Sequence, residues 1–341
     1  MMKKRLIYEY FTKFCTCAVV TACLMLTSAY AATLVPLDGS AEEGSDENVT
    51  SEEKQSVSVP ASSVPEPSVT GEEINVTEGS EEPEEPVYSN AIPAVNLAQY
   101  TLGNVPEIKV IDQTGYAPDV SDYVGAELKT GQVVSDKPTV LIYHTHGTER
   151  YAAYGTYPDG YEFNSENTDE NVVAVGDALA EYLEELGIHV IHDRTMYDAD
   201  GYTTAYARSK KSAKELLAAY PTVEYAIDLH RDSVESGGRQ AKTVTLFDDE
   251  CAQVMIVVGT DAGGSSHKNW KDNFAVAVRL QQTMNELYPT FARPIYLRTA
   301  SFNQELCPGA LLIEVGACGN TVGEAKNAAK LLAGCIEKSF R

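Results

Sequence analysis

Two histidines and a glutamate lie within six residues at the end of one predicted strand. The apolar run Val140–Tyr143 leads directly into His144-Thr-His146-Gly-Thr-Glu149. Because side chains alternate along a strand, His144 and His146 point the same way at its carboxyl end. Ligands bind at that edge in open α/β sheets. His146 and Glu149 also form an H-x-x-E pair, which can hold one metal ion in a tight turn.

A third ligand comes from a second short apolar strand that ends in a histidine, Ala226-Ile-Asp-Leu-His230. Two histidines and one glutamate make the open three-ligand shell of a catalytic zinc site, with water in the fourth position. The sequence therefore predicts hydrolysis of a carbonyl compound, with zinc held by His146, Glu149 and His230.

Zinc hydrolysis also needs a group that carries protons, usually a carboxylate. Glu314 stands near the end of the otherwise apolar run Leu311–Gly316, where an unpaired ionisable group is costly to bury. Because two other strands deliver ligands to the same edge, we interpret Glu314 as the general base and acid. A structural salt bridge is the alternative.

Other polar residues near these strand ends have less specific roles. His144 is either a ligand in place of Glu149 or a group that orients the site. Arg231 could bind a substrate carboxylate, because a guanidinium fork suits that geometry, or it could pair with its neighbour Asp232.

Three further positions carry weaker signals. His192 ends a strand and is expected to be an ordinary hydrogen-bonded histidine. His267 lies in a Gly- and Ser-rich loop and is expected at the surface. The pair Asn303-Gln304 precedes the last strand and could line a substrate groove.

From Pro138 onward, strand and helix patterns alternate, which predicts a single three-layer α/β domain with a largely parallel twisted sheet. The capping box Thr321-x-x-Glu324 opens the final helix. The predicted strands are 139–143, 188–192, 223–229 and 310–315. The predicted helices are 170–186, 205–220, 270–287 and 321–340. A hairpin is predicted from 243–247 and 253–258.

Charge and composition divide the rest of the chain. The 341 residues carry a formal net charge of −24, and the segment 37–87 holds 15 acidic residues against one lysine. Such a surface disfavours nucleic acid, which needs clustered Lys and Arg. We expect residues 36–93 to be a disordered acidic linker, 94–137 to be a lead-in with a short strand near 108–111, and 138–341 to be the catalytic domain.

The first 35 residues are typical of an export signal. Lys3, Lys4 and Arg5 precede an uncharged stretch over 14–32, and Ala29-Tyr-Ala31 suits signal cleavage. The same stretch is nearly long enough to span a bilayer. We therefore expect an exported protein, either anchored at the outer face of the cytoplasmic membrane or secreted into the cell-wall space.

Several ordered motifs together resemble the stage II sporulation protein P family. They are Tyr143-His-Thr-His-Gly-Thr-Glu149, Asn171-Val-Val-Ala-Val-Gly-Asp177, Ile227-Asp-Leu-His-Arg-Asp-Ser233, and Leu312-Ile-Glu-Val-Gly-Ala-Cys-Gly-Asn-Thr321 with Glu324-Ala325. The resemblance covers about 138–340. It implies an exported, zinc-dependent cell-wall hydrolase of spore-forming bacteria. The implied reaction is cleavage of the amide between N-acetylmuramic acid and L-alanine, with endopeptidase action on stem-peptide cross-links. The resemblance also implies a role in engulfment together with stage II sporulation proteins D and M.

Wider relatives of that family are the zinc amidases of the N-acetylmuramoyl-L-alanine amidase type. Their first-strand Gly-His-Gly falls on Thr145-His146-Gly147, which favours His146 over His144 as the ligand. Their third-strand histidine falls on His230, and their final-strand catalytic glutamate falls on Glu314. Their glutamate ligand lies at a helix start, so Glu149 and Glu170 are both candidates. The H-x-x-E spacing favours Glu149.

Two other functions compete with the amidase. One is a catalytically silent protein that binds or scaffolds the wall, which the presence of all four site residues disfavours. The other is a zinc carboxypeptidase, which would release free D-alanine and not intact stem peptides.

Overall fold

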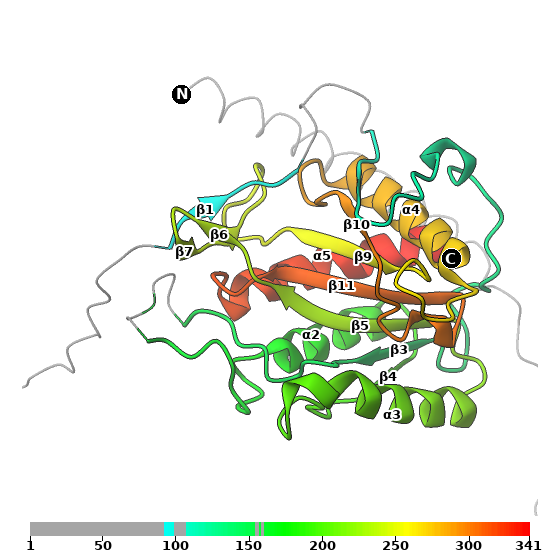
Figure 1. The fold of residues 1–341 in the computed structure, drawn as a ribbon, viewed down its shortest axis with the longest axis horizontal. Helices are drawn as coiled ribbons and strands as arrows, with labels where there is room; N and C mark the ends of the chain where they lie inside the picture. Colours follow the sequence, from blue (N-terminus) through cyan, green and yellow to red (C-terminus); the bar gives the residue numbers. More distant parts are fainter. Residues whose placement is uncertain (1–91, 99–106, 154–156, 158–159) are drawn as a thin grey trace, which may run out of the picture. The chain divides into compact units, whose positions relative to one another are not determined.

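The computed structural model describes residues 92–98, 107–153, 157 and 160–341 (Figure 1). The predicted signal or anchor segment and nearly all of the predicted acidic linker lie outside the described residues. Within the described part, no helix has the length and apolar character needed to cross a bilayer.

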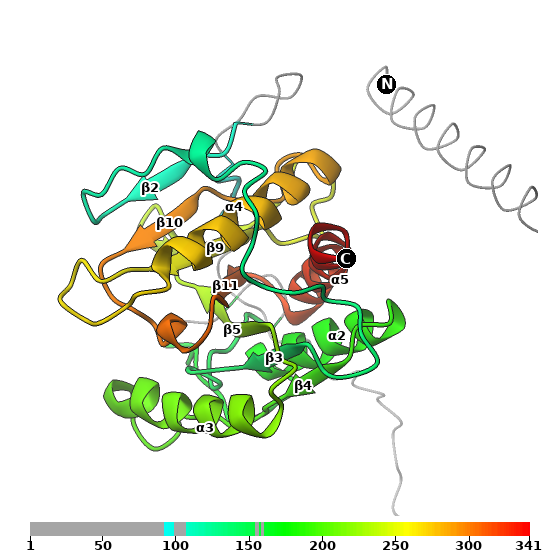
Figure 2. The same ribbon diagram turned by 90° about the vertical axis from the view of Figure 1, so that its right-hand side faces the viewer.

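A seven-stranded sheet forms the centre of the described residues, with the strand order β2-β10-β9-β11-β5-β3-β4 (Figures 1 and 2). All neighbouring strands are parallel except β9 and β11. The strands are β2 (Val110–Asp112), β3 (Val140–Tyr143), β4 (Val190–His192), β5 (Tyr225–Asp232), β9 (Val254–Gly259), β10 (Ile295–Arg298) and β11 (Gly309–Ala317). Two short ribbons accompany the sheet: β1 (Ala94–Val95) pairs with β8 (Lys242–Thr243), and β6 (Glu235–Ser236) pairs with β7 (Arg239–Gln240).

Helices cover both faces of this sheet, so the predicted three-layer α/β architecture is confirmed. The helices are α2 (Val172–Glu185), α3 (Ala205–Ala219), α4 (Trp270–Leu287) and α5 (Val322–Phe340), with short 3-10 turns η1 (Val120–Asp122), η2 (Tyr202–Thr204) and η3 (Gln304–Leu306). Helices α2, α4 and α5 share the main core with alternate strand residues such as Val140 and Ile142. Helix α3 packs on the other face against Leu141 and Tyr143, opposite α2 and α5 (Figure 2).

Local sequence explains where the helices begin and end. Helix α4 spans the predicted 270–287, and the predicted capping box is present at the start of α5. Helix α2 begins after Asn171, whose side chain accepts a hydrogen bond from the backbone of Val173. It ends before Gly187, whose φ of 77° suits a helix C-terminus.

The region between β5 and α4 differs from the sequence prediction. No hairpin joins 243–247 to 253–258 in the described residues, because Thr243 pairs with Val95 and the later segment becomes the central strand β9. Strand β10, which lies between β9 and β2, was not predicted from the sequence. The predicted short strand near 108–111 is present as β2, at the edge of the sheet.

The register of three central strands brings their polar ends together. Tyr143 of β3 lies opposite Asp228 of β5, so the segment after β3 runs beside His230. On the other side of β5, Glu314 of β11 lies opposite His230. These strands are neighbours in the sheet, and each is parallel to the next.

Candidate metal centre

His146, Glu149 and His230 converge although they come from two separate parts of the chain. One ligand atom from each residue lies within 4.8 Å of the other two. His146 and Glu149 belong to the turn after β3, and His230 belongs to β5, the adjacent strand. The structure therefore brings together the three residues that the sequence predicted as ligands.

The turn after β3 is fixed by several hydrogen bonds. The backbone N–H of Glu149 donates to the carbonyl of His146 (3.1 Å), which closes the turn. The carboxylate of Glu149 accepts the backbone N–H of Arg231 (3.0 Å), which ties the turn to β5. A Cβ on Gly147 would lie 2.8 Å from the Cα of Met196, so only glycine fits between these two ligands.

The charges of the three residues are strongly coupled. One carboxylate oxygen of Glu149 lies 3.3 Å from Nδ1 of His230, and the other lies 3.7 Å from Nδ1 of His146. Burial alone would raise the pKa of Glu149, but His230 and Arg231 outweigh it and lower that pKa to about 2. Burial also opposes the charged form of His230, yet the carboxylates of Asp228 and Glu149 raise the pKa of His230 well above its usual value.

The donor set of this cluster suits zinc. Two imidazoles and one carboxylate are the ligands of open catalytic zinc sites. The Nε2 atom of His146 is buried and has no hydrogen-bond partner among the described residues. A buried polar atom without a partner is costly, and a bound cation would remove that cost for a ligating imidazole.

Glu314 lies beside this cluster with one carboxylate oxygen unpaired. Its Oε2 atom is buried and has no hydrogen-bond partner within the described part of the chain. Burial raises the pKa of Glu314 to about 8, although nearby His230 opposes the shift. The register between β11 and β5 shifts just after Glu314, at Gly316, which has a φ of 73°. A carboxyl group in this environment can exchange a proton near neutral pH.

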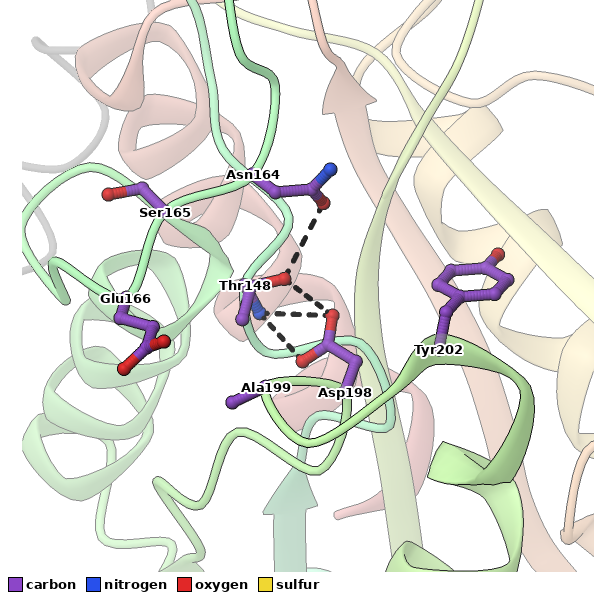
Figure 3. Close-up of a pocket in the computed structure, with 7 residues that line it drawn as sticks. All are labelled: Thr148, Asn164, Ser165, Glu166, Asp198, Ala199 and Tyr202. Atoms are coloured by element: carbon purple, nitrogen blue, oxygen red, sulfur yellow. Dashed lines mark hydrogen bonds between the residues drawn. The ribbon is translucent and has the colours of Figure 1, made fainter.

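A surface pocket of about 340 Å³ borders the turn after β3, where Thr148 lines it (Figure 3). Its lining is Thr148, Asn164, Ser165, Glu166, Asp198, Ala199 and Tyr202. The backbone N–H and the hydroxyl of Thr148 both donate to the carboxylate of Asp198, as Figure 3 shows. The ring of Tyr202 stacks on His146, with centroids 4.1 Å apart and planes 15° apart. The pocket and the candidate metal centre therefore share a wall.

Comparison with known protein families identifies the family of this chain. The family model of Stage II sporulation protein P (SpoIIP) matches residues 30–337, which include every candidate site residue. This chain belongs to the Stage II sporulation protein P family. The Stage II sporulation protein P of Bacillus subtilis (strain 168) is 30% identical to it over 223 residues, covering 61% of this chain and 53% of that protein. The chain thus spans about half the length of the curated relative it matches.

Comparison with solved structures finds amidases that are similar to part of this chain. The N-acetylmuramoyl-L-alanine amidase AmiC2 of Nostoc punctiforme is 13% identical, with a TM-score of 0.35 over 60% of this chain and 96% of that chain. The CwlD amidase of Clostridioides difficile, solved in complex with the GerS lipoprotein, is 14% identical, with a TM-score of 0.38 over 59% of this chain and 95% of that chain.

His144, the alternative ligand considered from the sequence, lies outside the three-residue cluster. Its Nδ1 contacts the carbonyl of Leu229 (2.9 Å), and its Nε2 contacts Nε2 of His192 (2.8 Å). Nδ1 of His192 in turn lies 3.1 Å from the carboxylate of Asp177. Burial lowers the pKa of both histidines to about 4. His192 is thus the hydrogen-bonded histidine that the sequence predicted.

Glu170, the alternative glutamate, also lies outside the cluster. Its carboxylate pairs with Arg150 at 2.7 Å, just before α2. Glu149 is therefore the glutamate that faces the two histidines.

The predicted substrate-binding residues Arg231 and Asp232 have protein partners. The guanidinium of Arg231 donates to the carbonyls of Arg150 (3.0 Å) and Phe163 (2.7 Å). Asp232 pairs with Arg293 at 2.7 Å. Arg231 and Asp232 therefore do not pair with each other, and each has its own partners in the protein.

Two weaker predictions concern residues that are buried in the structure. His267 is 1% exposed and its Nε2 contacts Asn273 at 2.9 Å, so the surface prediction was wrong. Asn303 and Gln304 are also buried, and both bond within the protein instead of lining the pocket.

Three residues around the centre were not predicted from the sequence: Asp198, Tyr202 and Asp228. Asp228 had a usable signal, because it stands two residues before His230 and therefore shares its face of β5. Asp198 and Tyr202 reach the centre from the long segment between β4 and α3, where no periodic pattern indicates their position.

Proposed function

We propose that this protein is a zinc-dependent peptidoglycan hydrolase that cleaves the amide between N-acetylmuramic acid and L-alanine during engulfment in sporulation. The observation that carries the proposal is the convergence of His146, Glu149 and His230 within 4.8 Å, beside the unpaired carboxylate of Glu314. Membership of the Stage II sporulation protein P family supports the choice of substrate and process.

His146, Glu149 and His230 would hold the zinc ion in this proposal. When bound, zinc supplies Lewis acidity and lowers the pKa of water to about 7. Glu314 accepts a proton from the attacking water at its unpaired Oε2 and then donates it to the leaving nitrogen. Asp198 holds the turn that carries Glu149, because it accepts two hydrogen bonds from Thr148.

The pocket beside the centre supplies room for part of the substrate. It shares Thr148 and Tyr202 with the surroundings of the cluster, and 65% of Tyr202 is exposed. Polar groups of Asn164 and Glu166 also line it, which suits a hydrated sugar or peptide. We therefore place the muropeptide in this pocket, with its amide bond over the cluster.

Mass spectrometry of digested peptidoglycan tests this function. Purified wall is incubated with the protein, with and without a zinc chelator. Release of intact stem peptides that the chelator prevents is the expected result. Free D-alanine would identify a carboxypeptidase, and peptides cut at cross-links would identify an endopeptidase. An unchanged wall after incubation with zinc-loaded protein would support the silent scaffold and contradict the proposal.

The place of action is part of the same proposal. We propose that the N-terminal 35 residues export the domain, either as an anchor or as a cleaved signal, and that 36–93 act as a linker. Stage II sporulation proteins D and M are the proposed partners. Protease added to intact protoplasts should remove the domain, and full protection would contradict export.

A further inference from the structure

The imidazole of His230 lies between two carboxylates. Glu149 approaches Nδ1 at 3.3 Å, and Asp228 approaches the opposite nitrogen, Nε2, at 2.9 Å. The ring N–H is not aligned with Asp228, so this contact is an ion pair and not a linear hydrogen bond. Glu149 belongs to the candidate metal centre, whereas Asp228 lies on the far side of the ring.

Asp228 is fully buried, so its charge needs compensation from the protein. The backbone N–H of Thr145 donates to one carboxylate oxygen of Asp228 at 2.8 Å. The hydroxyl of Thr145 donates to the other oxygen at 2.6 Å. Both bonds come from the residue directly before His146, so one short segment contacts both the metal cluster and the carboxylate behind it.

The hydrogen bonds continue away from Asp228 through buried groups. The hydroxyl of Thr145 donates to Asp228, and the hydroxyl of Ser209 lies 2.8 Å from that of Thr145 and 3.3 Å from the carbonyl of Tyr206. Ser209 in turn accepts a bond from the side-chain N–H of Asn303 at 3.1 Å. Thr145, Ser209 and Asn303 thus form a buried chain of polar contacts that ends at Asp228. Asn303 holds its place with a left-handed backbone, at a φ of 58°.

We propose that Asp228 is a positioning residue for the metal ligand His230. It contacts the imidazole of His230 from the side of Nε2 and so keeps Nδ1 directed at Glu149 of the candidate metal centre. Ligating histidines generally give their second ring N–H to a carboxylate or carbonyl, and removal of that partner weakens metal binding. Thr145, Ser209 and Asn303 keep the carboxylate of Asp228 in place. This inference rests on the proposed zinc site.

Zinc affinity of an Asp228→Asn variant tests the inference. Asparagine keeps the shape of the side chain but removes its charge. We expect zinc to bind about 10–100-fold more weakly, measured by competition with a chromogenic chelator. The matched control is Asp193→Asn, because Asp193 also accepts side-chain hydrogen bonds but contacts none of the three ligands. It should bind zinc like the wild type, and a wild-type affinity in Asp228→Asn would overturn the inference.

A second variant, Thr145→Val, tests the inference without changing Asp228. Thr145→Val removes one hydrogen bond to Asp228 and should weaken zinc binding less than Asp228→Asn does. The double variant should lose no more affinity than Asp228→Asn alone, because Thr145 acts through Asp228. If the two losses of zinc affinity added fully in the double variant, or if Thr145→Val left the affinity unchanged, Thr145 would not act through Asp228. A wild-type protein that binds no zinc would instead refute the proposed metal centre itself.

Discussion

Two pairs of histidines lie at the ends of neighbouring strands and differ in how their ring nitrogens are used. In the first pair, His144 and His192 contact each other, and their remaining nitrogens contact a backbone carbonyl and Asp177. In the second pair, His146 and His230 surround Glu149, and Nε2 of His146 has no hydrogen-bond partner in the described residues.

The two pairs also differ in the pKa values of their histidines. Burial lowers the pKa of His144 and His192 to about 4, so both are neutral at neutral pH. The pKa of His230 is raised by two carboxylates in spite of its burial. One pair is a completed hydrogen-bond network, and the other is a charged cluster that a cation can complete. Residue type alone cannot separate the two, because both pairs consist of strand-end histidines.

The largest expected effect comes from replacing one histidine of each pair. His146→Ala should lose both bound zinc and hydrolysis, because two remaining ligands hold zinc too weakly. His192→Ala should keep one zinc per protein. Metal analysis of the purified variants measures both. The comparison fails if His146→Ala keeps its zinc.

The glutamates offer the same kind of contrast. Glu149→Gln should lose zinc, and Glu170→Gln should keep it, because the partly exposed carboxylate of Glu170 contacts Arg150 and Asn167 and lies outside the cluster. The reverse result would move the third ligand to Glu170.

The next largest effect concerns the unpaired carboxylate beside the second pair. Glu314→Gln keeps the shape of the side chain but cannot accept a proton. It should retain zinc and peptidoglycan binding while kcat falls by about 10²–10⁴-fold, the usual span for general acid–base catalysis. Zinc content, melting temperature and turnover are measured on one preparation. A stable, zinc-loaded and fully active variant would leave Glu314 without a catalytic role.

A smaller effect should appear in the pH dependence of zinc binding. Without metal, His230 holds a proton at neutral pH because its pKa is raised, and zinc binding must displace that proton. The affinity should therefore fall as the pH falls, by about tenfold per pH unit for each proton released. Zinc titrations between about pH 6 and 8 measure this slope. An affinity that stays constant over this range would mean that His230 is neutral before zinc binds.

The smallest effect on metal binding should come from the first pair, where the loss appears in stability instead. His192→Ala leaves Nε2 of His144 without its partner in a buried site. The free energy of unfolding should fall by about 1–3 kcal/mol. Urea unfolding of the metal-free proteins measures this loss. If the free energy of zinc binding fell by more than the free energy of unfolding, the two pairs would be coupled.

The predictable part of this site depends on a simple geometric rule. Parallel neighbouring strands end at the same edge of a sheet, so polar residues near the ends of β3, β5 and β11 meet even though they are distant in sequence. The periodic apolar patterns of α4 and α5 were equally clear, and both helices have the predicted bounds to within one residue.

The rest depended on contacts that no local pattern records. The segment 253–258 looked like half of a hairpin, but it is a central strand between β10 and β11. His267 stands in a polar loop, yet the side chain of Asn273 gives it a buried partner. Whether Glu149 or Glu170 faces the histidines depended on the turn after β3, which is fixed by bonds to β5.

The pairing of β3 with β5 also has a consequence for the order in which the protein folds. Glu149 accepts a hydrogen bond from Arg231 across 82 residues, and α2, β4 and α3 lie between them in the chain. Closing so long a loop costs entropy before any contact at its ends is gained. The three ligands meet only after this whole crossover has docked. A metal ion that required all three would therefore lengthen the lifetime of the folded protein by slowing its unfolding, and it would do little to speed its folding.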